Sequence, residues 1–406
     1  MSRVEGNILP DGWEVKSLAD IGKIFSGNSI NAKLKEEKYT NKEGTPYVAT
    51  KDISYNSVIN YDNGINIPFD DVNKFRLAKS ETILICAEGG SAGRKVGILN
   101  QDVYFVNKLF ALETINEVNS KFCFYWYLSK EFKSNFKDKL KGLIGGVSKT
   151  DFKNLPIPIP PLEEQKRIVA KIDTLFVKID KAISLSEESL KQAKSLLPSV
   201  LKGIFEKGKA DGWEEKKLGE VIEKTQNVNP KTSLFDEFTY IDISAVDKAL
   251  QEIVLPKTVK SIDAPSRAKK SIELDDILFA TTRPNLKNIA IVSVLYEFPI
   301  ASTGFCVVRS NSVTHNRYLF YYLISDLLQE QIEPYIRGAQ YPAISDKDLK
   351  SVLIPVPNLK EQIQVSALFD KISNQSKQTQ SKLEEQLRYL KQLKSSILSK
   401  AFKGEL

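Results

Sequence analysis

The chain contains the stretch Pro158-Ile159-Pro160-Pro161-Leu162-Glu163-Glu164-Gln165 and, 197 residues later, the stretch Pro355-Val356-Pro357-Asn358-Leu359-Lys360-Glu361-Gln362. Proline suits the first turn of a helix, and acidic side chains are favoured near a helix N-terminus. Each stretch therefore predicts the start of a helix. Because the phrase occurs twice, the chain is predicted to be a two-fold internal repeat.

A long helix is predicted after each proline-rich stretch. Apolar or small residues recur at alternating spacings of three and four, from Ile168 to Ile204 in the first copy and, less perfectly, from Val365 to Ala401 in the second. This spacing is typical of a helix with one packed seam. The two helices are predicted to pair as an antiparallel coiled coil, and association between separate chains is the alternative. Pro198 predicts a kink or break near Leu197.

A second repeated phrase opens each globular part, as Asp11-Gly12-Trp13-Glu14 and as Asp211-Gly212-Trp213-Glu214. Short β-rich runs follow, separated by turns rich in Gly, Asn and Asp. Aromatic runs at 120–129 and 318–325 have helical spacing. They are predicted to be buried core helices, and a base-stacking surface is the alternative.

The predicted fold class is α+β with a pseudo-two-fold internal repeat. Residues 1–157 and 210–354 are predicted to form two globular α/β domains. Residues 158–209 and 355–406 are predicted to form the two long antiparallel helical regions that join them.

The net charge of +7 lies in the helical regions. Residues 162–209 hold ten basic and seven acidic side chains, and residues 359–406 hold nine and five, so the remainder of the chain is neutral. If the globular parts bind an anionic polymer such as nucleic acid, they must therefore use local groups of basic side chains.

The sequence shows no constellation of catalytic or metal-binding residues. The single histidine, His315, lies in a turn-like stretch, and Cys86, Cys123 and Cys306 lie among apolar neighbours without a ligand spacing. The thiols are predicted to be buried and reduced. No secretory signal and no apolar run of about 18 residues is present. We therefore expect a cytoplasmic, non-enzymatic protein with no membrane contact, metal or cofactor.

Two glycine-rich stretches superficially resemble nucleotide-binding loops. Gly142–Thr150 has the wrong spacing for a phosphate-binding loop, and a turn into a helix start is predicted there instead. Gly89–Gly93 precedes strand-like residues, whereas a dinucleotide-binding fingerprint precedes a helix.

The repeated phrases resemble those of the specificity (S) subunits of type I restriction–modification systems. The resemblance covers essentially the whole chain. It rests on the Gly-Trp-Glu openings at 12–14 and 212–214, and on the proline-rich stretches 158–165 and 355–362 with their long helices. Two copies of both phrases in this order and spacing make the resemblance specific.

The resemblance implies a non-catalytic subunit with two target-recognition domains, each of which reads one half of a bipartite DNA sequence. The helices would set the spacer between the half-sites. The implied partners are double-stranded DNA, two methyltransferase subunits docked on the helices, and two restriction subunits. Catalysis would reside in those partner subunits.

Sequence discrimination requires hydrogen bonds to base edges, with phosphate contacts that fix the register. The candidates in the first domain are Lys51, Arg76, Ser91, Arg94, Lys95 and Lys149. The candidates in the second domain are Arg267, Lys269, Arg283, Asn285, Lys287, Arg337 and Gln340. Residues 283–288 are the strongest group, because they form a polar loop between two predicted strands. An ordinary solvated side chain is the competing interpretation for each residue.

The candidate recognition loops differ between the copies. Residues 88–94 stand where the second copy has residues 281–287, and no residue is identical between them. The half-sites are therefore predicted to differ, which makes the target non-palindromic. A coiled-coil scaffold with protein-binding ends is the competing class, favoured by the neutral globular parts. A nuclease with its own specificity module would require catalytic motifs that the sequence does not show.

Overall fold

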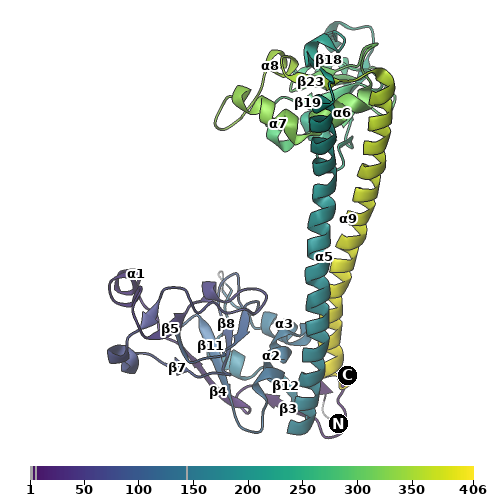
Figure 1. Ribbon diagram of the computed structural model, residues 1–406. Coiled ribbons are helices and arrows are strands. Elements are labelled where there is room, and N and C mark those ends of the chain that lie inside the picture. The colour runs from purple at the N-terminus through teal and green to yellow at the C-terminus, as the bar shows by residue number, and fades with distance from the viewer. Residues whose placement is uncertain (1–2, 5–6, 143–144) are drawn as a thin grey trace. The chain divides into compact units, whose positions relative to one another are not determined.

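The computed structural model describes residues 3–4, 7–142 and 145–406, which form two compact units. Unit 1 comprises residues 1–186 and 385–406, and unit 2 comprises residues 187–384. Two long helices, α5 (Leu162–Ala210) and α9 (Leu359–Phe402), contribute to both units (Figure 1). Each unit therefore consists of a globular α/β part and a piece of each helix, which confirms the predicted α+β class.

The globular part of unit 1 contains two four-stranded sheets within its described residues. Their strand orders are β6-β5-β10-β7 and β4-β11-β8-β9. The elements are β1 (Arg3–Val4), β2 (Asn7–Ile8), β3 (Glu14–Ser17), β4 (Gly22–Ser26), α1 (Ala32–Leu34), β5 (Thr45–Val48), β6 (Asn66–Ile67), β7 (Leu77–Ala78), β8 (Ile83–Cys86), β9 (Val96–Ile98), β10 (Val103–Phe105), β11 (Leu109–Thr114), α2 (Ser120–Leu128), α3 (Lys130–Lys137), α4 (Lys149–Lys153) and β12 (Pro156–Ile159).

The globular part of unit 2 follows the same plan, with strand orders β17-β14-β21-β18 and β20-β19-β22. Strand β14 runs parallel to β21, as β5 runs parallel to β10 in unit 1. The elements are β13 (Glu214–Lys217), β14 (Glu237–Ile241), β15 (Val246–Asp247), β16 (Glu252–Ile253), β17 (Lys257–Lys260), β18 (Ala268–Ser271), β19 (Ile277–Ala280), β20 (Ile289–Ile291), β21 (Ile300–Ser302), β22 (Phe305–Val308), α6 (Asn316–Ile324), α7 (Asp326–Ile332), α8 (Asp346–Lys350) and β23 (Leu353–Val356).

The two repeated phrases of each copy pair with each other. In unit 1, β3 and β12 form an antiparallel ribbon in which Glu14 lies opposite Ile159. In unit 2, β13 and β23 form the equivalent ribbon, with Glu214 opposite Val356. A ribbon of two edge strands tolerates the prolines, because a proline nitrogen can face away from the partner strand. The opening phrase and the proline-rich phrase therefore recur together because their strands pair with each other.

A buried glutamine fixes the start of each long helix. The side chains of Gln165 and Gln362 are fully buried. Gln165 accepts a hydrogen bond from the backbone N–H of Asn119 at 2.8 Å and donates to the carbonyl of Pro160 at 2.9 Å. Gln362 accepts from the backbone N–H of His315 at 2.9 Å and donates to the carbonyls of Val313 and Pro357 at 2.9 and 2.8 Å. The amide thus joins the helix to the loop that precedes the aromatic helix.

An aromatic cluster receives the end of each long helix. The ring of Phe402 lies 5.1 Å from Phe122 and 5.0 Å from Trp126, both on α2. The ring of Phe205 lies 5.0 Å from Tyr322, on α6. Helices α2 and α6 are almost wholly buried, which confirms that the aromatic runs are core. Each globular part therefore holds the start of the helix that follows it and the end of the other helix.

A part-buried carboxylate contact repeats this attachment. Asp173 on α5 pairs with Lys121 at 2.7 Å and accepts a hydrogen bond from the hydroxyl of Tyr125. Asp370 on α9 accepts a hydrogen bond from the hydroxyl of Tyr321 at 2.7 Å. Burial, with the neighbouring carboxylate, raises the pKa of both phenols, so each remains a hydrogen-bond donor at neutral pH.

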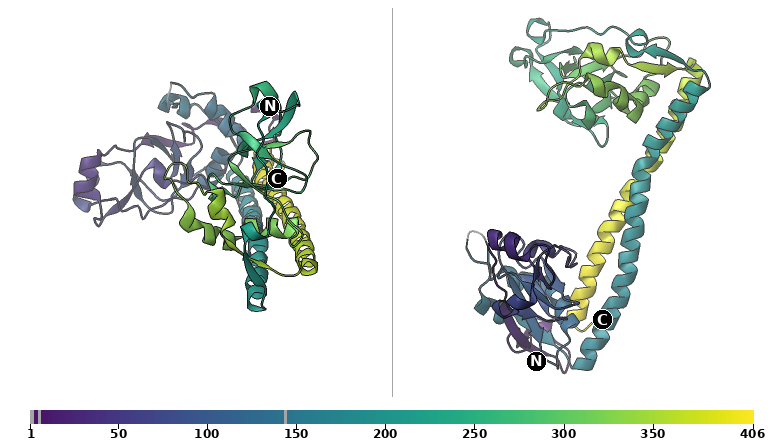
Figure 2. Two further views of the ribbon diagram at one scale, coloured as in Figure 1. Left: turned by 90° about the horizontal axis from the view of Figure 1, so that it is seen from above. Right: turned by 60° about the vertical axis from the view of Figure 1, so that its left-hand side comes forward.

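The two long helices run antiparallel. In unit 1, residues 168–179 of α5 share a core with residues 397–402 of α9. In unit 2, Leu201 and Phe205 of α5 share a core with Phe369 of α9. The helices lie side by side within each unit in both views of Figure 2. The start of one helix therefore packs with the end of the other, as the seam pattern predicts.

Polar residues in the seam of α9 have partners on α5. The buried hydroxyl of Ser376 donates a hydrogen bond to the carbonyl of Ala193 at 2.6 Å. Lys394 pairs with Asp180, and its ammonium lies 4.7 Å from the ring centre of Phe176. These contacts explain why the second apolar series can be interrupted without loss of the helix pair.

Of the predicted kink or break at Pro198, the break is wrong, because α5 continues through this residue to Ala210; the kink stays a prediction. A proline inside a helix costs about 3 kcal/mol and leaves the carbonyl four residues earlier, here that of Lys194, without its amide partner. Leu197, Leu201 and Phe205 pack against the core of unit 2 on either side of the proline. This burial outweighs the cost, so the helix persists.

None of the helices in the described residues is both long and apolar enough to cross a membrane.

Replacing Gln362 by leucine should lower the free energy of unfolding by about 1–3 kcal/mol, because the amide group of His315 and the carbonyls of Val313 and Pro357 lose their buried partner. Urea denaturation measures this loss. The matched control is Gln375→Leu, at an exposed position of the same helix, which should change the stability by less than about 0.5 kcal/mol. Equal effects of the two substitutions would contradict this role for Gln362.

The single histidine should titrate below its ordinary pKa of 6.5 in the folded chain. Burial and then the charge of Arg317 lower the pKa of His315, and Asp370 and Asp275 oppose them. Between the folded pKa and 6.5 the unfolded chain binds more protons, so stability falls as the pH drops through this window. NMR titration of the imidazole measures the pKa. His315→Gln should flatten the stability profile in the window, and an imidazole pKa above 6.5 would refute the expectation.

Candidate nucleic-acid interface

The unit 1 turn, residues 87–94, follows the buried strand β8 and carries several candidate residues. The backbone N–H of Val147 donates to the carbonyl of Ala87 at 3.0 Å, and that of Gly89 to the carbonyl of Gly145 at 2.7 Å. Gly93 has a φ of +69°, and a Cβ atom there would lie 2.6 Å from the ring of Phe136. The turn is therefore held by a neighbouring loop and by a close approach that only glycine permits.

The unit 2 turn, residues 281–288, has the same framework after strand β19. The backbone N–H of Ile344 donates to the carbonyl of Thr281 at 2.9 Å, as Val147 does to Ala87. Arg337 and Ala343 exchange two backbone hydrogen bonds of 2.9 Å, which close the unit 2 loop, residues 337–343, beside this turn. Equivalent backbone frames thus present two turns that have no identical residue at any aligned position.

Three candidates of unit 1 gather around the ring of Tyr55. The hydroxyls of Tyr55 and Ser91 are 3.2 Å apart, the guanidinium of Arg94 lies 4.9 Å from the ring centre, and the ammonium of Lys95 lies 5.3 Å from it. Lys95 also donates to the carbonyl of Thr50 at 3.0 Å. Thr50 opens a short 3-10 helix, Thr50–Asp52, in which the candidate Lys51 is exposed. The structure therefore brings Lys51, Ser91, Arg94 and Lys95 to one region.

The candidates of unit 2 gather where the turn meets the unit 2 loop. Arg283 has a left-handed backbone with a φ of +50°, and its N–H donates to the carbonyl of Pro342 at 2.6 Å. Its guanidinium lies 5.3 Å from the ring centre of Tyr341. Asn285 on the turn, and Arg337 and Gln340 on the loop, are exposed. A left-handed arginine is strained, and such residues occur most often at functional sites.

Two other unit 2 candidates lie on or near the turn. Lys287 donates to the carboxylate of Asp326 at 2.7 Å and to the carbonyl of Ile324 at 2.9 Å, so it fastens the turn to the end of α6. Arg267 lies beside Gly304, whose carbonyl accepts a hydrogen bond from the N–H of Thr281. Lys287 is thus engaged within the protein, whereas Arg267 is exposed near the turn.

Three candidates lie on other elements. The guanidinium of Arg76 donates to the carbonyl of Ser26 at 3.2 Å. Lys149 is exposed at the first position of α4, and Lys269 is exposed on β18. These side chains carry charge at the surface but do not belong to the two clusters at the turns.

The prediction of a helix start after residue 147 is confirmed. Ser148 accepts a hydrogen bond from the N–H of Asp151 at the start of α4, and Ser345 accepts one from Asp348 at the start of α8. Residues 143 and 144 of the stretch that superficially resembles a phosphate-binding loop lie outside the described residues.

The sequence reasoning missed the tyrosines at the two clusters. Tyr55 and Tyr341 expose 58% and 68% of their surface, whereas the rings of the helical aromatic runs are buried. The signal was present, because each tyrosine lies in a short polar or glycine-containing stretch outside the helical aromatic runs. The contact of Tyr55 with Arg94 joins residues 39 positions apart, which no local pattern reveals.

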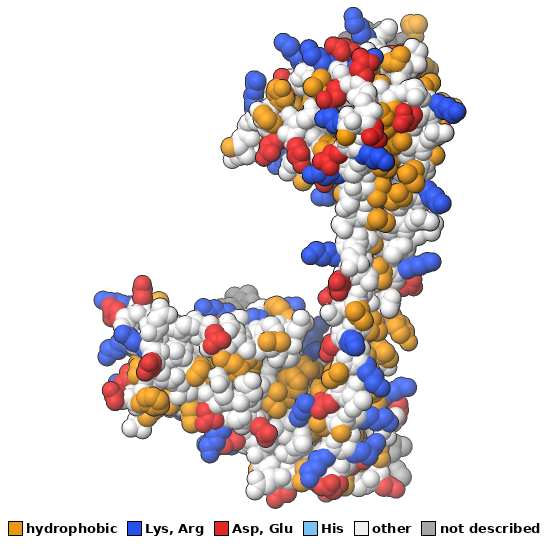
Figure 3. All heavy atoms as spheres, in the orientation of Figure 1, with side chains coloured by type: hydrophobic (Ala, Val, Ile, Leu, Met, Phe, Trp, Pro, Cys, Tyr) orange, Lys and Arg blue, Asp and Glu red, His pale blue; other side chains and the backbone are white. Residues whose placement is uncertain are grey.

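Charge is mixed over the globular surfaces. Basic and acidic side chains are interspersed on the face shown in Figure 3. Glu88 on the unit 1 turn pairs with Lys108 at 3.3 Å, and Lys270 in unit 2 pairs with Asp346 at 2.7 Å. A broad basic field is therefore absent from this face among the described residues, and anion binding depends on local groups.

The cysteines are buried, as predicted. Cys86, Cys123 and Cys306 are all free thiols in the core. Burial raises the pKa of the Cys306 thiol to about 12 and also raises the pKa of Cys86. The thiols therefore stay protonated at neutral pH, which makes them poor nucleophiles.

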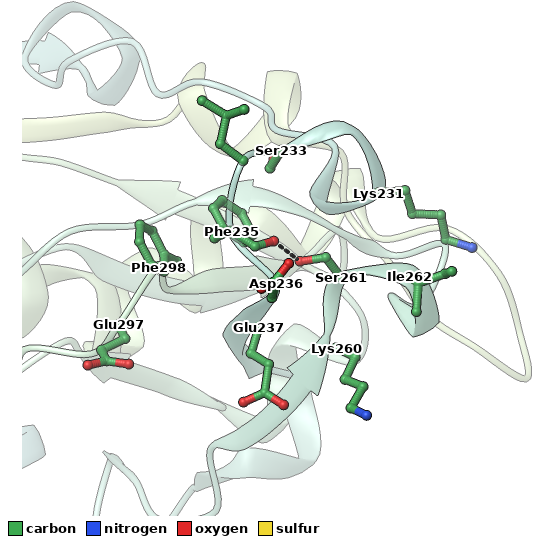
Figure 4. A pocket seen from close by; sticks show the side chains of 11 residues that line it. Lys231, Ser233, Phe235, Asp236, Glu237, Lys260, Ser261, Ile262, Glu297 and Phe298 are labelled. Carbon is green, nitrogen blue, oxygen red and sulfur yellow. Dashed lines mark hydrogen bonds between the residues drawn. The ribbon is translucent and has the colours of Figure 1, made fainter.

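A surface hollow in unit 2 lies apart from the turns. It is bordered by the stacked rings of Phe235 and Phe298, 4.7 Å apart, and by the lysine and acidic side chains labelled in Figure 4. The hydroxyl of Ser261 donates to the carbonyl of Phe235 at 2.6 Å, which ties its edge together. Across the described part of the chain, no group of three His, Cys, Asp or Glu side chains is arranged to hold a metal ion.

The family model for the type I restriction modification DNA specificity domain matches residues 10–192 and again residues 210–389. The two matches cover most of the chain. The chain therefore belongs to the family of type I restriction–modification specificity subunits and carries two copies of its DNA specificity domain.

Similar proteins have the same description. The specificity subunit of the type I restriction enzyme MjaVIII from Methanocaldococcus jannaschii is 29% identical over 405 residues, covering 91% of this chain and 88% of that protein. The specificity subunit of the type I restriction enzyme EcoKI from Escherichia coli (strain K12) is 22% identical, covering 98% of this chain and 90% of that protein.

Two solved structures share the fold. A chain of a type I restriction–modification system has a TM-score of 0.75 at 21% identity, covering 98% of this chain and 100% of that chain. The HsdS subunit from Thermoanaerobacter tengcongensis has a TM-score of 0.60 at 23% identity, covering 98% of each chain.

Proposed function

We propose that this specificity subunit directs a type I restriction–modification complex to an asymmetric bipartite DNA sequence, one half of which is read by each globular part. The proposal rests on two turns that have the same backbone hydrogen bonds but different side chains. The hydrogen bonds Val147 to Ala87 and Ile344 to Thr281 hold the two turns in the same way, while the side chains on them differ. Two equivalent backbone frames that carry different side chains would recognise two different half-sites, as a non-palindromic target requires.

The proposed contacts combine two kinds of side chain. Ser91, Arg94, Arg283, Asn285 and Gln340 have the donors and acceptors that read base edges in the major groove. Lys51 and Lys95 beside the unit 1 turn, Arg267 and Arg337 beside the unit 2 turn, and Arg76, Lys149 and Lys269 on other elements would fix the register through phosphate contacts, while Lys287 holds the turn that carries Arg283 and Asn285. Because the globular parts are neutral overall, affinity depends on these few local contacts.

We further propose that two methyltransferase subunits dock along the helices, with two restriction subunits joining them. Exposed apolar side chains on the helices support a protein partner: Val177 and Leu185 on α5, and Leu368 and Tyr389 on α9. The two-fold frame would provide two equivalent attachment sites. Methylation and cleavage would be catalysed by these partners in the cytoplasm, a reducing compartment compatible with three free buried thiols.

Methylation mapping tests this function. Genomic DNA from cells that express the chain with its methyltransferase partner should carry methyl groups at one bipartite motif with unlike halves. Cells that express either protein alone should lack this methylation. A palindromic motif would contradict the asymmetric reading. Methylation that is unchanged without this chain would exclude the proposed function and favour the scaffold alternative.

Shortening both helices by one heptad should shorten the spacer between the half-sites. Seven helical residues span about 10 Å, which corresponds to about three base pairs of DNA. The deletions should remove matched segments of α5 and α9, so that the seam keeps its register. A shortened motif with unchanged half-sites is the expected methylation map. An unchanged spacer in a folded, active complex would show that the helices do not set it.

A further inference from the structure

The guanidinium groups of Arg94 and Arg283 each lie on an exposed tyrosine ring at a recognition turn. The distances to the ring centres are 4.9 Å for Tyr55 and 5.3 Å for Tyr341. Each arginine belongs to the turn itself, while its tyrosine comes from a neighbouring loop. The two arginines stand at different positions of their turns, near the end of the unit 1 turn and near the start of the unit 2 turn, so the same kind of arginine–tyrosine contact is built from different positions in the two units.

The pairing of these two arginines differs from that of arginines with structural roles. Arg167, Arg309 and Arg317 form ion pairs with Glu164, Asp276 and Asp370, respectively. Among the residues that the structure describes, neither Arg94 nor Arg283 has a carboxylate within ion-pair distance. A guanidinium that lies over a ring and forms no ion pair keeps most of its five N–H donors available for a ligand, although one donor of Arg94 is used by the carbonyl of Gly90.

We propose that Tyr55 and Tyr341 are positioning residues that hold Arg94 and Arg283 for bidentate hydrogen bonding to a guanine, one in each half-site. This inference rests on the proposed function. Arginine donating to O6 and N7 of guanine is the commonest specific contact in the major groove, and its two donors match the guanidinium edge. An arginine that is already restrained by a ring loses less side-chain freedom on binding, so more of the hydrogen-bond energy contributes to discrimination.

The backbone around each arginine adds to this restraint. The strained backbone of Arg283 is fixed by the hydrogen bond from its N–H to the carbonyl of Pro342, next to Tyr341. In unit 1, Arg94 donates to the carbonyl of Gly90 at 3.3 Å, and Ser91 contacts the hydroxyl of Tyr55. The tyrosines come from unrelated segments in the two units, so the guanidinium groups need not address the same position of their half-sites.

The test uses the full chain assembled with its methyltransferase partner and a panel of duplexes that carries every single base-pair substitution of the mapped motif. Arg283→Ala should reduce discrimination at one G·C pair of one half-site about ten- to a hundredfold and leave the other half-site unchanged. Arg94→Ala should do the same in the other half-site. Tyr341→Leu should reduce discrimination at the Arg283 position about two- to fivefold, and Tyr341→Phe should restore most of it because the ring is kept.

Lys347→Ala serves as the matched control, since Lys347 is an exposed cation of unit 2 on α8, outside the turn and its loop. It should bind the panel as the wild type does. Arg283→Ala or Arg94→Ala would overturn the inference if binding fell equally on all duplexes, which indicates a phosphate contact, or if discrimination did not change. A wild-type complex with no sequence preference would refute the proposed function itself, so the two failures are distinguishable.

Discussion

Gln165 and Gln362 each place a fully buried side-chain amide between the first turn of a long helix and the loop before an aromatic helix. A buried amide is stable only when its donors and acceptor are satisfied, so these hydrogen bonds fix where each helix leaves its globular part. The paired strands of the opening and proline-rich phrases, and the rings that receive Phe205 and Phe402, depend on that position. Because both copies use the same contacts, the buried glutamines give the two globular parts equivalent attachments to the long helices.

The residues that attach the globular parts to the helices differ from the residues proposed to contact DNA. The frame uses buried hydrogen bonds, aromatic packing and the helix seam, and it carries the net positive charge. The turns carry few charges, and several of those, such as Lys287, are engaged within the protein. Specificity therefore has to come from a small number of well-placed side chains. A change of target would require new residues on a turn and its neighbouring loop, while the frame could stay as it is.

The sequence predicted the frame well because its residues repeat at a nearly constant offset and their periodicity is local. The helix starts, the buried aromatic helices and the antiparallel pair all follow from such patterns. The break predicted at Pro198 does not occur, because helix propensity considers the local chain alone, whereas Leu201 and Phe205 are buried in the core of unit 2. At the candidate site, residue type alone was enough to identify Arg94 and Arg283. The contact of Tyr55 with Arg94 and the bond of Lys287 to the carbonyl of Ile324 join segments that are distant in the sequence. Such contacts leave no trace in a single sequence.

If two equivalent frames carry two different recognition domains, then giving the chain two identical recognition domains should make its target symmetric. Residues 211–354 would be replaced by a copy of residues 11–157, which joins matching phrases at both ends. The methylation map of cells that express this chimera with the methyltransferase partner should show a symmetric motif, with the half-site of the first domain repeated in inverted orientation. A folded, active chimera that still methylates the original asymmetric motif would show that the second globular part does not read its own half-site.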